Sequence, residues 1–227
     1  MDNRVIVTLI MIACFVPAIV VHEVAHGFVA YKLGDPTAKQ QGRLTLNPLK
    51  HVDPFGTVIL PIVMAIAGGP VFGYAKPVPY NPAYFKNIRM GELMTGLAGP
   101  TSNLAMGLAA ALIVNLLVLP GFLPATASIW IIIAGYYFVL INFCLMFFNL
   151  LPIPPLDGSS IIAPLLSDKA LRQYYRVQRY ALPVLLVLLF VVPYVASQFF
   201  GVDFSPIGIY INATAGNLTD LLFGLLI

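Results

Sequence analysis

Long apolar runs alternate with short polar segments along most of this chain of 227 residues. A helix needs about 20 apolar residues to cross the hydrocarbon core of a bilayer. Runs at 5–31, 93–119, 128–151 and 181–200 have that length, and a run at 206–227 is weaker because its middle is polar. The pattern predicts an all-α integral membrane protein, a bundle of about five to six transmembrane helices.

One apolar segment, residues 56–72, is short and is interrupted by Pro61, Gly68, Gly69 and Pro70. Irregular backbone at bilayer depth has to be sheltered from lipid by protein. We therefore expect a re-entrant or short β-containing segment around residues 40–75. The alternation in Arg43-Leu44-Thr45-Leu46 predicts a short strand within it.

The composition supports a membrane protein with no large soluble part. Hydrophobic residues make up 59% of the chain and charged residues 9%, whereas soluble domains carry about 25% charged residues. We expect a single transmembrane domain over residues 1–227, with a core at about 5–165 and C-terminal helices at 180–227. Cys14 and Cys144 lack metal-type spacing and are expected to be buried small hydrophobes.

The basic residues indicate orientation rather than nucleic-acid binding. If residues 56–72 enter and leave on one side, loops 32–54, 73–92 and 159–180 share that side and hold every Lys and Arg except Arg4. If the segment crosses fully, the basic residues are split between the two sides. The one-sided distribution favours the first arrangement and a multi-pass cell-membrane protein with these loops in the cytoplasm.

Three ionisable side chains interrupt the first apolar run, in His22-Glu23-Val24-Ala25-His26. Residues four apart lie on one face of a helix, so both imidazoles could bind one Zn²⁺. Glu23 could then accept the proton that a water gives up. The alternative is a chance match, but a charge at bilayer depth costs about 2.5–3.5 kcal/mol and is rarely incidental. His51, in a polar segment, is expected to be a solvated loop residue.

A catalytic zinc usually takes three protein ligands. Asp157 is the best-placed third ligand, because it follows a span that ends on the same side as the histidines. Its neighbours Pro152, Pro154 and Pro155 stop the helix, and Gly158 permits a sharp turn. The alternative is that Asp157 caps a short helix at 159–166, and the spacing leaves both open. Other acidic candidates are Glu92, Asp203 and Asp220.

Several motifs together resemble the site-2 protease family of intramembrane zinc metalloproteases, in its compact bacterial and archaeal type without an accessory domain. The resemblance covers roughly residues 15–165. It is carried by the His22–His26 motif on a membrane helix, by Leu156-Asp157-Gly158 after a later span, and by three further segments: Gly42-Arg43-Leu44-Thr45-Leu46-Asn47-Pro48, Ala75-Lys76-Pro77-Val78-Pro79 and Ala98-Gly99-Pro100-Thr101-Ser102-Asn103.

The resemblance implies that His22, His26 and Asp157 bind one Zn²⁺ per chain and that Glu23 is the general base. It also implies that Asn149, eight residues before the aspartate, holds the substrate backbone or the oxyanion. A helix-packing amide is the alternative for Asn149. Asn103, in a Gly-x-x-x-Asn element, is a weaker candidate for the same role.

The resulting hypothesis is a zinc-dependent endopeptidase that cuts transmembrane protein or peptide substrates within or near the membrane. An extended substrate could pair with a strand edge at Arg43–Leu46 or Thr57–Leu60. The main rival is a membrane transporter or channel with an intramembrane ion site, against which stands the lack of an evident internal repeat. A third possibility is an inactive relative that only binds membrane partners.

Overall fold

The computed structural model describes residues 3–59 and 75–224, and these residues are helical or irregular, with no strand among them. Four helical segments in this part are long and apolar enough to cross a membrane: Val5–Lys32, Ile88–Val118, Ala125–Asn149 and Ala181–Phe200. The four strong spans expected from the apolar runs are confirmed. The protein is an all-helical membrane protein over the described residues.

Helix α1 (Asn3–Lys32) carries the His-Glu-x-x-His motif in its second half. Pro17 lies inside α1 without ending it, one turn before the motif. Beyond α1, a loop layer holds α2 (Thr37–Gln40), η1 (Pro48–Lys50) and η2 (Pro54–Ile59). After the undescribed residues 60–74, the chain has no regular secondary structure from Ala75 to Asn81, and η3 (Pro82–Tyr84) follows.

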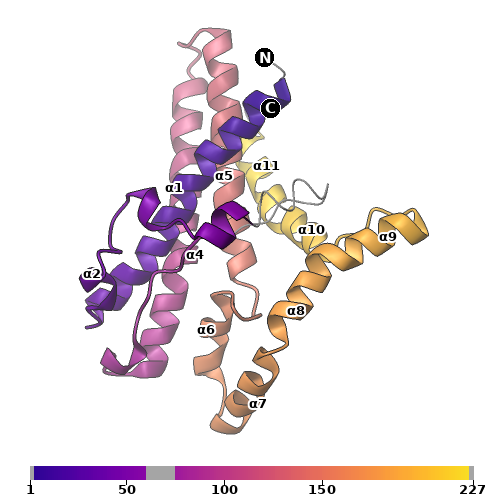
Figure 1. Ribbon diagram of the computed structural model, residues 1–227. Helices are drawn as coiled ribbons and strands as arrows, with labels where there is room; N and C mark the ends of the chain where they lie inside the picture. Colours follow the sequence, from indigo (N-terminus) through magenta and orange to yellow (C-terminus); the bar gives the residue numbers. More distant parts are fainter. Residues whose placement is uncertain (1–2, 60–74, 225–227) are drawn as a thin grey trace.

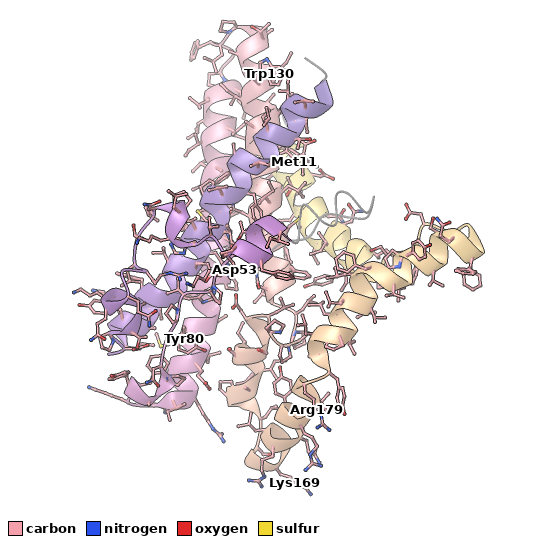
Figure 2. All side chains as sticks on the ribbon, viewed as in Figure 1. Met11, Asp53, Tyr80, Trp130, Lys169 and Arg179 are labelled. Carbon is pink, nitrogen blue, oxygen red and sulfur yellow. The ribbon has the colours of Figure 1, made fainter. Side chains whose placement is uncertain are left out.

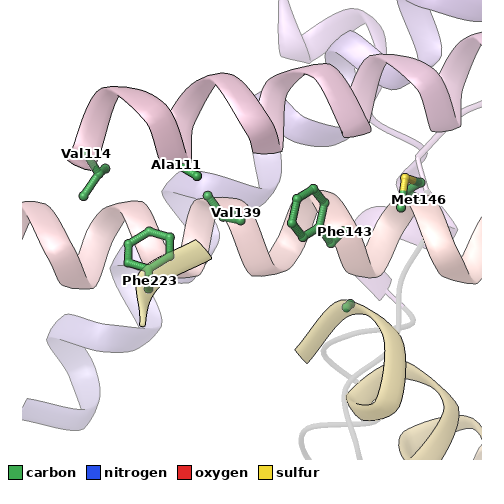
Figure 3. Close-up of a cluster of buried hydrophobic side chains, with 7 residues drawn as sticks. Ala111, Val114, Val139, Phe143, Met146 and Phe223 are labelled. Atoms are coloured by element: carbon green, nitrogen blue, oxygen red, sulfur yellow. The ribbon is translucent and has the colours of Figure 1, made fainter. Parts of the chain in front are cut away.

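Helices α4 (Ile88–Val118) and α5 (Ala125–Asn149) pack along each other and against α1, and form the centre of the molecule (Figure 1). Asn87 begins α4 by accepting a hydrogen bond from the backbone N–H of Met90, as an N-cap residue should. The cluster of buried side chains in Figure 3 lies between α4, α5 and the C-terminal part of the chain: Ala111, Val114, Val139, Phe143, Met146, Ala215 and Phe223.

The C-terminal helices pack on this centre. Elements α10 (Pro206–Ile211), η6 (Asn212–Gly216) and α11 (Asn217–Phe223) follow one another without a break. The Tyr136 hydroxyl of α5 donates to Oδ1 of Asp220 at 2.7 Å, and Nδ2 of Asn115 in α4 donates to the Leu222 carbonyl at 3.2 Å. Polar residues in this apolar segment therefore attach it to α4 and α5.

The segment between these two parts begins packed against α4 and then leaves the centre. Short α6 (Gly158–Ile162) and η4 (Ala163–Leu165) lead into α7 (Asp168–Gln178), followed by α8 (Ala181–Leu186), η5 (Val187–Val191) and α9 (Val192–Phe200). Figure 1 shows α8 and α9 diverging from α1, α4 and α5. Lys169 and Arg179 lie at the end of the molecule opposite Trp130 (Figure 2).

The strand expected at Arg43–Leu46 is wrong, because the backbone there forms bends. Thr45 Oγ1 accepts the N–H of Asn47, whose own side chain then caps η1 through Leu49. These local hydrogen bonds occupy main-chain groups that a β-strand would use to pair with a neighbouring strand. The strand edge expected at Thr57–Leu60 is also wrong for residues 57–59, because these residues belong to the helical element η2. The remainder of the re-entrant prediction, residues 60–72, lies outside the described residues.

His51 is not a solvated loop residue. It is 2% exposed, its Nε2 lies 2.9 Å from the Thr45 carbonyl, and its own carbonyl accepts the N–H of Lys76. The sequence around His51 is polar, but the loop is packed, and the His51 ring contacts a main-chain carbonyl instead of water.

Candidate metal centre

His22 and His26 lie one turn apart on α1 and face the interior of the helix bundle. They are 3% and 9% exposed, and their Nε2 atoms are 3.1 Å apart. Their rings meet edge to face, with an interplanar angle of 82°. The helical spacing of the motif therefore brings two ring nitrogens to one buried point, as the sequence predicts.

Asp157 reaches the same point from a distant part of the sequence. Its Oδ2 lies 3.1 Å from Nε2 of His22 and 3.3 Å from Nε2 of His26. Asp157 occupies the N-cap position of α6, but its side chain makes no capping hydrogen bond. Of the two interpretations that the spacing leaves open, the geometry favours the one in which the carboxylate turns toward the histidines.

The other nitrogen of each imidazole is bound to an acceptor. Nδ1 of His22 lies 2.6 Å from Oδ1 of Asn103, and Nδ1 of His26 lies 2.7 Å from the Thr95 carbonyl. Because both partners are acceptors, each Nδ1 must carry the proton in a neutral ring. Both Nε2 atoms then present lone pairs toward each other and toward Asp157.

A second amide holds Asn103 in its orientation. Nδ2 of Asn103 donates to Oδ1 of Asn142 at 2.9 Å and to the Ala18 carbonyl at 3.3 Å. Nδ2 of Asn142 donates in turn to the Phe138 carbonyl of its own helix at 2.8 Å. Asn142 was missed in the sequence, where the only signal was one amide inside an apolar run.

The carboxylate completes a set of electron-pair donors. An aspartate carboxyl is ordinarily ionised at neutral pH, so Asp157 offers a negatively charged oxygen to this point. Its Oδ2 is buried and has no hydrogen-bond partner. A negative oxygen and two lone pairs at such short distances repel one another unless a cation lies among them.

The spacing of these three atoms fits a tetrahedral zinc. Bonds of about 2.1 Å place neighbouring ligand atoms of a tetrahedron about 3.4 Å apart, and the three observed distances are 3.1, 3.1 and 3.3 Å. Gly99 of α4 keeps this point open. A Cβ atom at Gly99 would lie 2.6 Å from Nε2 of His22 and would also collide with Nε2 of His26. Donor set, spacing and cradle therefore all suit a zinc ion.

Glu23 is held beside this cluster by the main chain of the segment at 75–81. Its Oε2 accepts the N–H of Val78 at 2.9 Å. No other hydrogen bond to this carboxylate occurs within residues 3–59 and 75–224. One carboxylate oxygen is therefore fixed and the other is available for a proton.

The two asparagines singled out in the sequence have different positions. Asn103 is 0% exposed and both ends of its amide are engaged by protein, so it is unsuited to contact a substrate, and its expected role there is revised to orienting His22. Nδ2 of Asn149 donates to the Leu145 carbonyl of α5 at 2.9 Å, which is the packing arrangement considered for it. The part of Asn149 in substrate binding stays a prediction.

A buried pair of imidazoles on a helix long enough to cross a membrane, with a carboxylate turned toward them from a later segment, is the arrangement expected of a metallohydrolase in a membrane. The sequence profile of Peptidase family M50 matches residues 124–192. The chain belongs to this family, the site-2 proteases, and is by family a zinc metalloprotease with membrane helices.

Curated relatives of the chain cover most of its length. It is 39% identical over 192 residues to "Putative zinc metalloprotease YwhC" of Bacillus subtilis, with 81% of this chain and 80% of the relative aligned. Two proteins named "Putative zinc metalloprotease Rip2" are also similar. The one from Mycolicibacterium smegmatis is 31% identical over 218 residues, covering 94% of this chain and 80% of the relative. The one from Mycobacterium tuberculosis is 33% identical over 196 residues, covering 86% and 72%. No solved structure matches the chain significantly.

Proposed function

We propose that this protein is a zinc-dependent intramembrane endopeptidase that hydrolyses peptide bonds within or near the transmembrane segments of membrane-protein substrates. The observation that carries this proposal is the meeting of His22, His26 and Asp157 at one buried point on a membrane-length helix, with Glu23 adjacent. Family membership supplies the reaction class, and the depth of the site supplies the substrate class.

In this proposal His22, His26 and Asp157 hold one zinc ion per chain. Two neutral nitrogens and one carboxylate oxygen are a typical ligand set for catalytic zinc. When bound, zinc lowers the pKa of a water to about 7 and polarises the scissile carbonyl. The Nδ1 contacts to Asn103 and to the Thr95 carbonyl keep the imidazoles in the tautomer that binding requires.

Glu23 is the general base. It takes a proton from the attacking water as the water oxygen bonds to the carbonyl carbon, and then gives that proton to the leaving amine as the C–N bond breaks. The hydrogen bond from Val78 fixes Oε2, so Oε1 is the oxygen that exchanges the proton.

Asn149 is proposed to stabilise the oxyanion or the substrate backbone. Its amide lies on the last residue of α5, eight residues before Asp157. To act, Nδ2 has to exchange its present bond to the Leu145 carbonyl for one to the substrate. The substrate also has to unwind locally, because a membrane helix hides its peptide groups in internal hydrogen bonds.

The proposed location is the cell membrane, with the site toward the cytoplasm. The loops that hold nearly all Lys and Arg flank the motif end of α1 and the Asp157 end of α5, and such loops stay in the cytoplasm. With residues 56–72 entering and leaving on one side, as the distribution of basic residues favours, a crossing at 206–227 would be added to the four candidate helices. The catalytic core is proposed to lie at about 5–165, followed by C-terminal helices at 180–227.

The proposal is tested with the full chain in proteoliposomes containing a model transmembrane substrate. Glu23→Gln should retain about one zinc per chain and lose cleavage by about 10²–10⁴-fold, the usual contribution of a general base. The control is Asp203→Asn, an exposed acid between α9 and α10, which should cleave as the parent does. Parent-like cleavage by Glu23→Gln would reject Glu23 as the base. A parent protein that binds no zinc would reject the function.

A further inference from the structure

The segment that holds Glu23 has an unusual distribution of hydrogen-bond donors. It reads Lys76-Pro77-Val78-Pro79, and proline has no backbone N–H. Val78 is therefore the only residue in positions 77–79 that can donate from its main chain, and it donates to Oε2 of Glu23. The two prolines also favour the extended conformation of this stretch. The sequence thus presents a single donor to the carboxylate.

The packing of the Val78 side chain sets the distance between the Val78 backbone N–H and α1. Val78 is buried and packs against α1 at Gly27, one turn beyond Glu23. A Cβ atom at Gly27 would lie 2.6 Å from Cγ1 of Val78 and 2.8 Å from Cδ2 of Leu44. The missing side chain at Gly27 therefore lets the segment at 75–81 approach α1 closely enough for the Val78 N–H to reach Glu23.

Arg43 binds the same peptide group from the opposite side. Its Nη2 donates to the carbonyls of Lys76 at 2.7 Å and Pro77 at 3.3 Å. The Pro77 carbonyl and the Val78 N–H belong to one planar peptide unit. Arg43 and Glu23 are thus joined through a single peptide group, with the cation at its oxygen and the carboxylate at its nitrogen.

The environment of Arg43 indicates that its guanidinium mainly serves to bind the carbonyls of Lys76 and Pro77. The side chain is 6% exposed, and in the described part of the chain no carboxylate lies within ion-pair distance of it. A buried guanidinium without an acidic partner is costly, and here it is directed at two carbonyls. Donation to the oxygen of a peptide group polarises that group and strengthens its N–H as a donor.

A second anchor lies further along the segment. Oδ2 of Asp35, which is fully buried, accepts the N–H of Asn81 at 2.6 Å, and the Lys76 N–H donates to the His51 carbonyl. Tyr80, labelled in Figure 2, lies between these anchors near the motif end of α1. The segment is held at both ends, and Arg43 is the anchor next to the peptide group that Glu23 uses.

We propose that Arg43 is a positioning residue for Glu23, acting through the Pro77–Val78 peptide group. This inference rests on the proposed function, in which Glu23 is the general base. Loss of Arg43 leaves the zinc ligands in place and frees the Val78 N–H from the orientation that Glu23 needs. The carboxylate then samples orientations in which it does not face the attacking water.

The experiment compares Arg43→Met and Arg43→Lys with the parent, all as full chains in nanodiscs. Lys39→Met is the matched control, because Lys39 is a nearby exposed cation in α2 whose Nζ donates to the Tyr31 hydroxyl and not to the segment at 75–81. Three measurements are made: zinc per chain, steady-state kinetics (kcat and KM) with a model transmembrane substrate, and amide hydrogen exchange over residues 77–79. Since the two prolines carry no amide hydrogen, exchange in that stretch reports Val78 alone.

For Arg43→Met we expect unchanged zinc, Val78 exchange faster by about tenfold or more, and kcat lower by about tenfold or more with KM within twofold. Arg43→Lys, which keeps a charge and can restore one bond, should lie between the parent and Arg43→Met. Lys39→Met should match the parent in all three measurements. Slow Val78 exchange in Arg43→Met, or a change confined to KM, would overturn the proposal.

A further variant tests the link without touching Arg43. Glu23→Ala removes the acceptor, so Val78 exchange should accelerate in it; parent-like exchange would overturn the proposal even if Arg43→Met does not fold. Exchange is measured without substrate. Faster exchange in the variants together with a parent that cleaves nothing would reject the proposed function but not the coupling.

Discussion

Nδ1 of His22 and Oδ1 of Asn103 lie 2.6 Å apart, and this contact decides which nitrogen of His22 faces the proposed metal. Asn103 can only accept at that oxygen, because its Nδ2 already donates to Asn142 and to the Ala18 carbonyl. The proton of His22 is therefore held on Nδ1. Asn103 of α4 and Asn142 of α5 thus keep the Nε2 lone pair of His22 free to bind a metal.

Removal of this amide should weaken metal binding without unfolding the protein. In Asn103→Ala, His22 can adopt either tautomer and its ring can rotate, so zinc affinity should fall by about 10–100-fold, as for other outer-shell partners of ligating histidines. Competition with a chromophoric chelator measures this affinity. Asn115→Ala, an amide further along α4 that binds the Leu222 carbonyl, should keep the parent affinity. Equal affinities in the two variants would contradict the role of Asn103.

A methyl group on Gly99 should occupy the position of the metal. Gly99→Ala places its Cβ 2.6 Å from Nε2 of His22, so we expect the purified variant to contain well under half of the parent's zinc. The measurement is elemental analysis of metal per chain. Gly107→Ala is the matched control on the same helix, since its Cβ would crowd Phe143 instead. That variant should lose stability but keep its zinc, and the reverse pattern would be evidence against the site.

Asp157→Asn should lower zinc affinity more than the loss of Asn103 does. The substitution keeps the shape of the side chain but removes the negative charge that faces the two imidazoles. We expect a loss exceeding the roughly 100-fold upper range of outer-shell changes, measured by the same chelator competition. Asp220→Asn, which alters an aspartate bound to Tyr136, provides the comparison. Zinc affinity that responds equally to both substitutions would reject Asp157 as a ligand.

Zinc removal should destabilise the folded protein. Without a cation, Asp157 and the two imidazoles direct lone pairs at one another. A ligand at 100 times its Kd stabilises the folded state by about 2.7 kcal/mol. Thermal unfolding in detergent, with zinc and then with chelator, should show a lower Tm without metal. The Asp157→Asn protein should show little zinc-dependent change in Tm, and a full-sized shift in it would place the stabilising metal elsewhere.

Tyr136→Phe should loosen the C-terminal helices. The substitution removes the 2.7 Å hydrogen bond to Asp220, and such interhelical bonds in membranes contribute about 0.6 kcal/mol on average and up to about 1.7. The free energy of unfolding should fall by that amount, with zinc content unchanged. A double-mutant cycle with Asp220→Asn isolates the pair, and full additivity of the two effects would show that the bond contributes nothing.

The membrane helices could be predicted because length and hydrophobicity decide them. The runs at 5–31, 93–119, 128–151 and 181–200 each match a helical segment of the structure, since a span must satisfy its backbone internally. The same reasoning failed for Arg43–Leu46. The alternation there comes from a buried arginine and from turn residues, each committed to main-chain groups elsewhere.

The candidate site could be predicted only in part. A fixed helical spacing was enough to pair His22 with His26, whereas the spacing around Asp157 suited a helix cap equally well. The choice between ligand and cap depends on the three-dimensional fold, which directs the Asp157 carboxylate toward the histidines and away from α6. Contacts such as Val78 with Glu23 and Asn142 with Asn103 join segments far apart in the sequence. No local pattern encodes such contacts, so they were not foreseen.

The order of the proposed ligands along the chain has a consequence for biosynthesis. His22 and His26 belong to α1, whereas Asp157 follows α4 and α5, the two membrane-length helices that the described residues place between them. A nascent chain therefore carries only an incomplete pair of ligands until α4 and α5 have entered the bilayer. Under the proposed function, proteolytic competence would therefore arise only after both of these helices have been inserted.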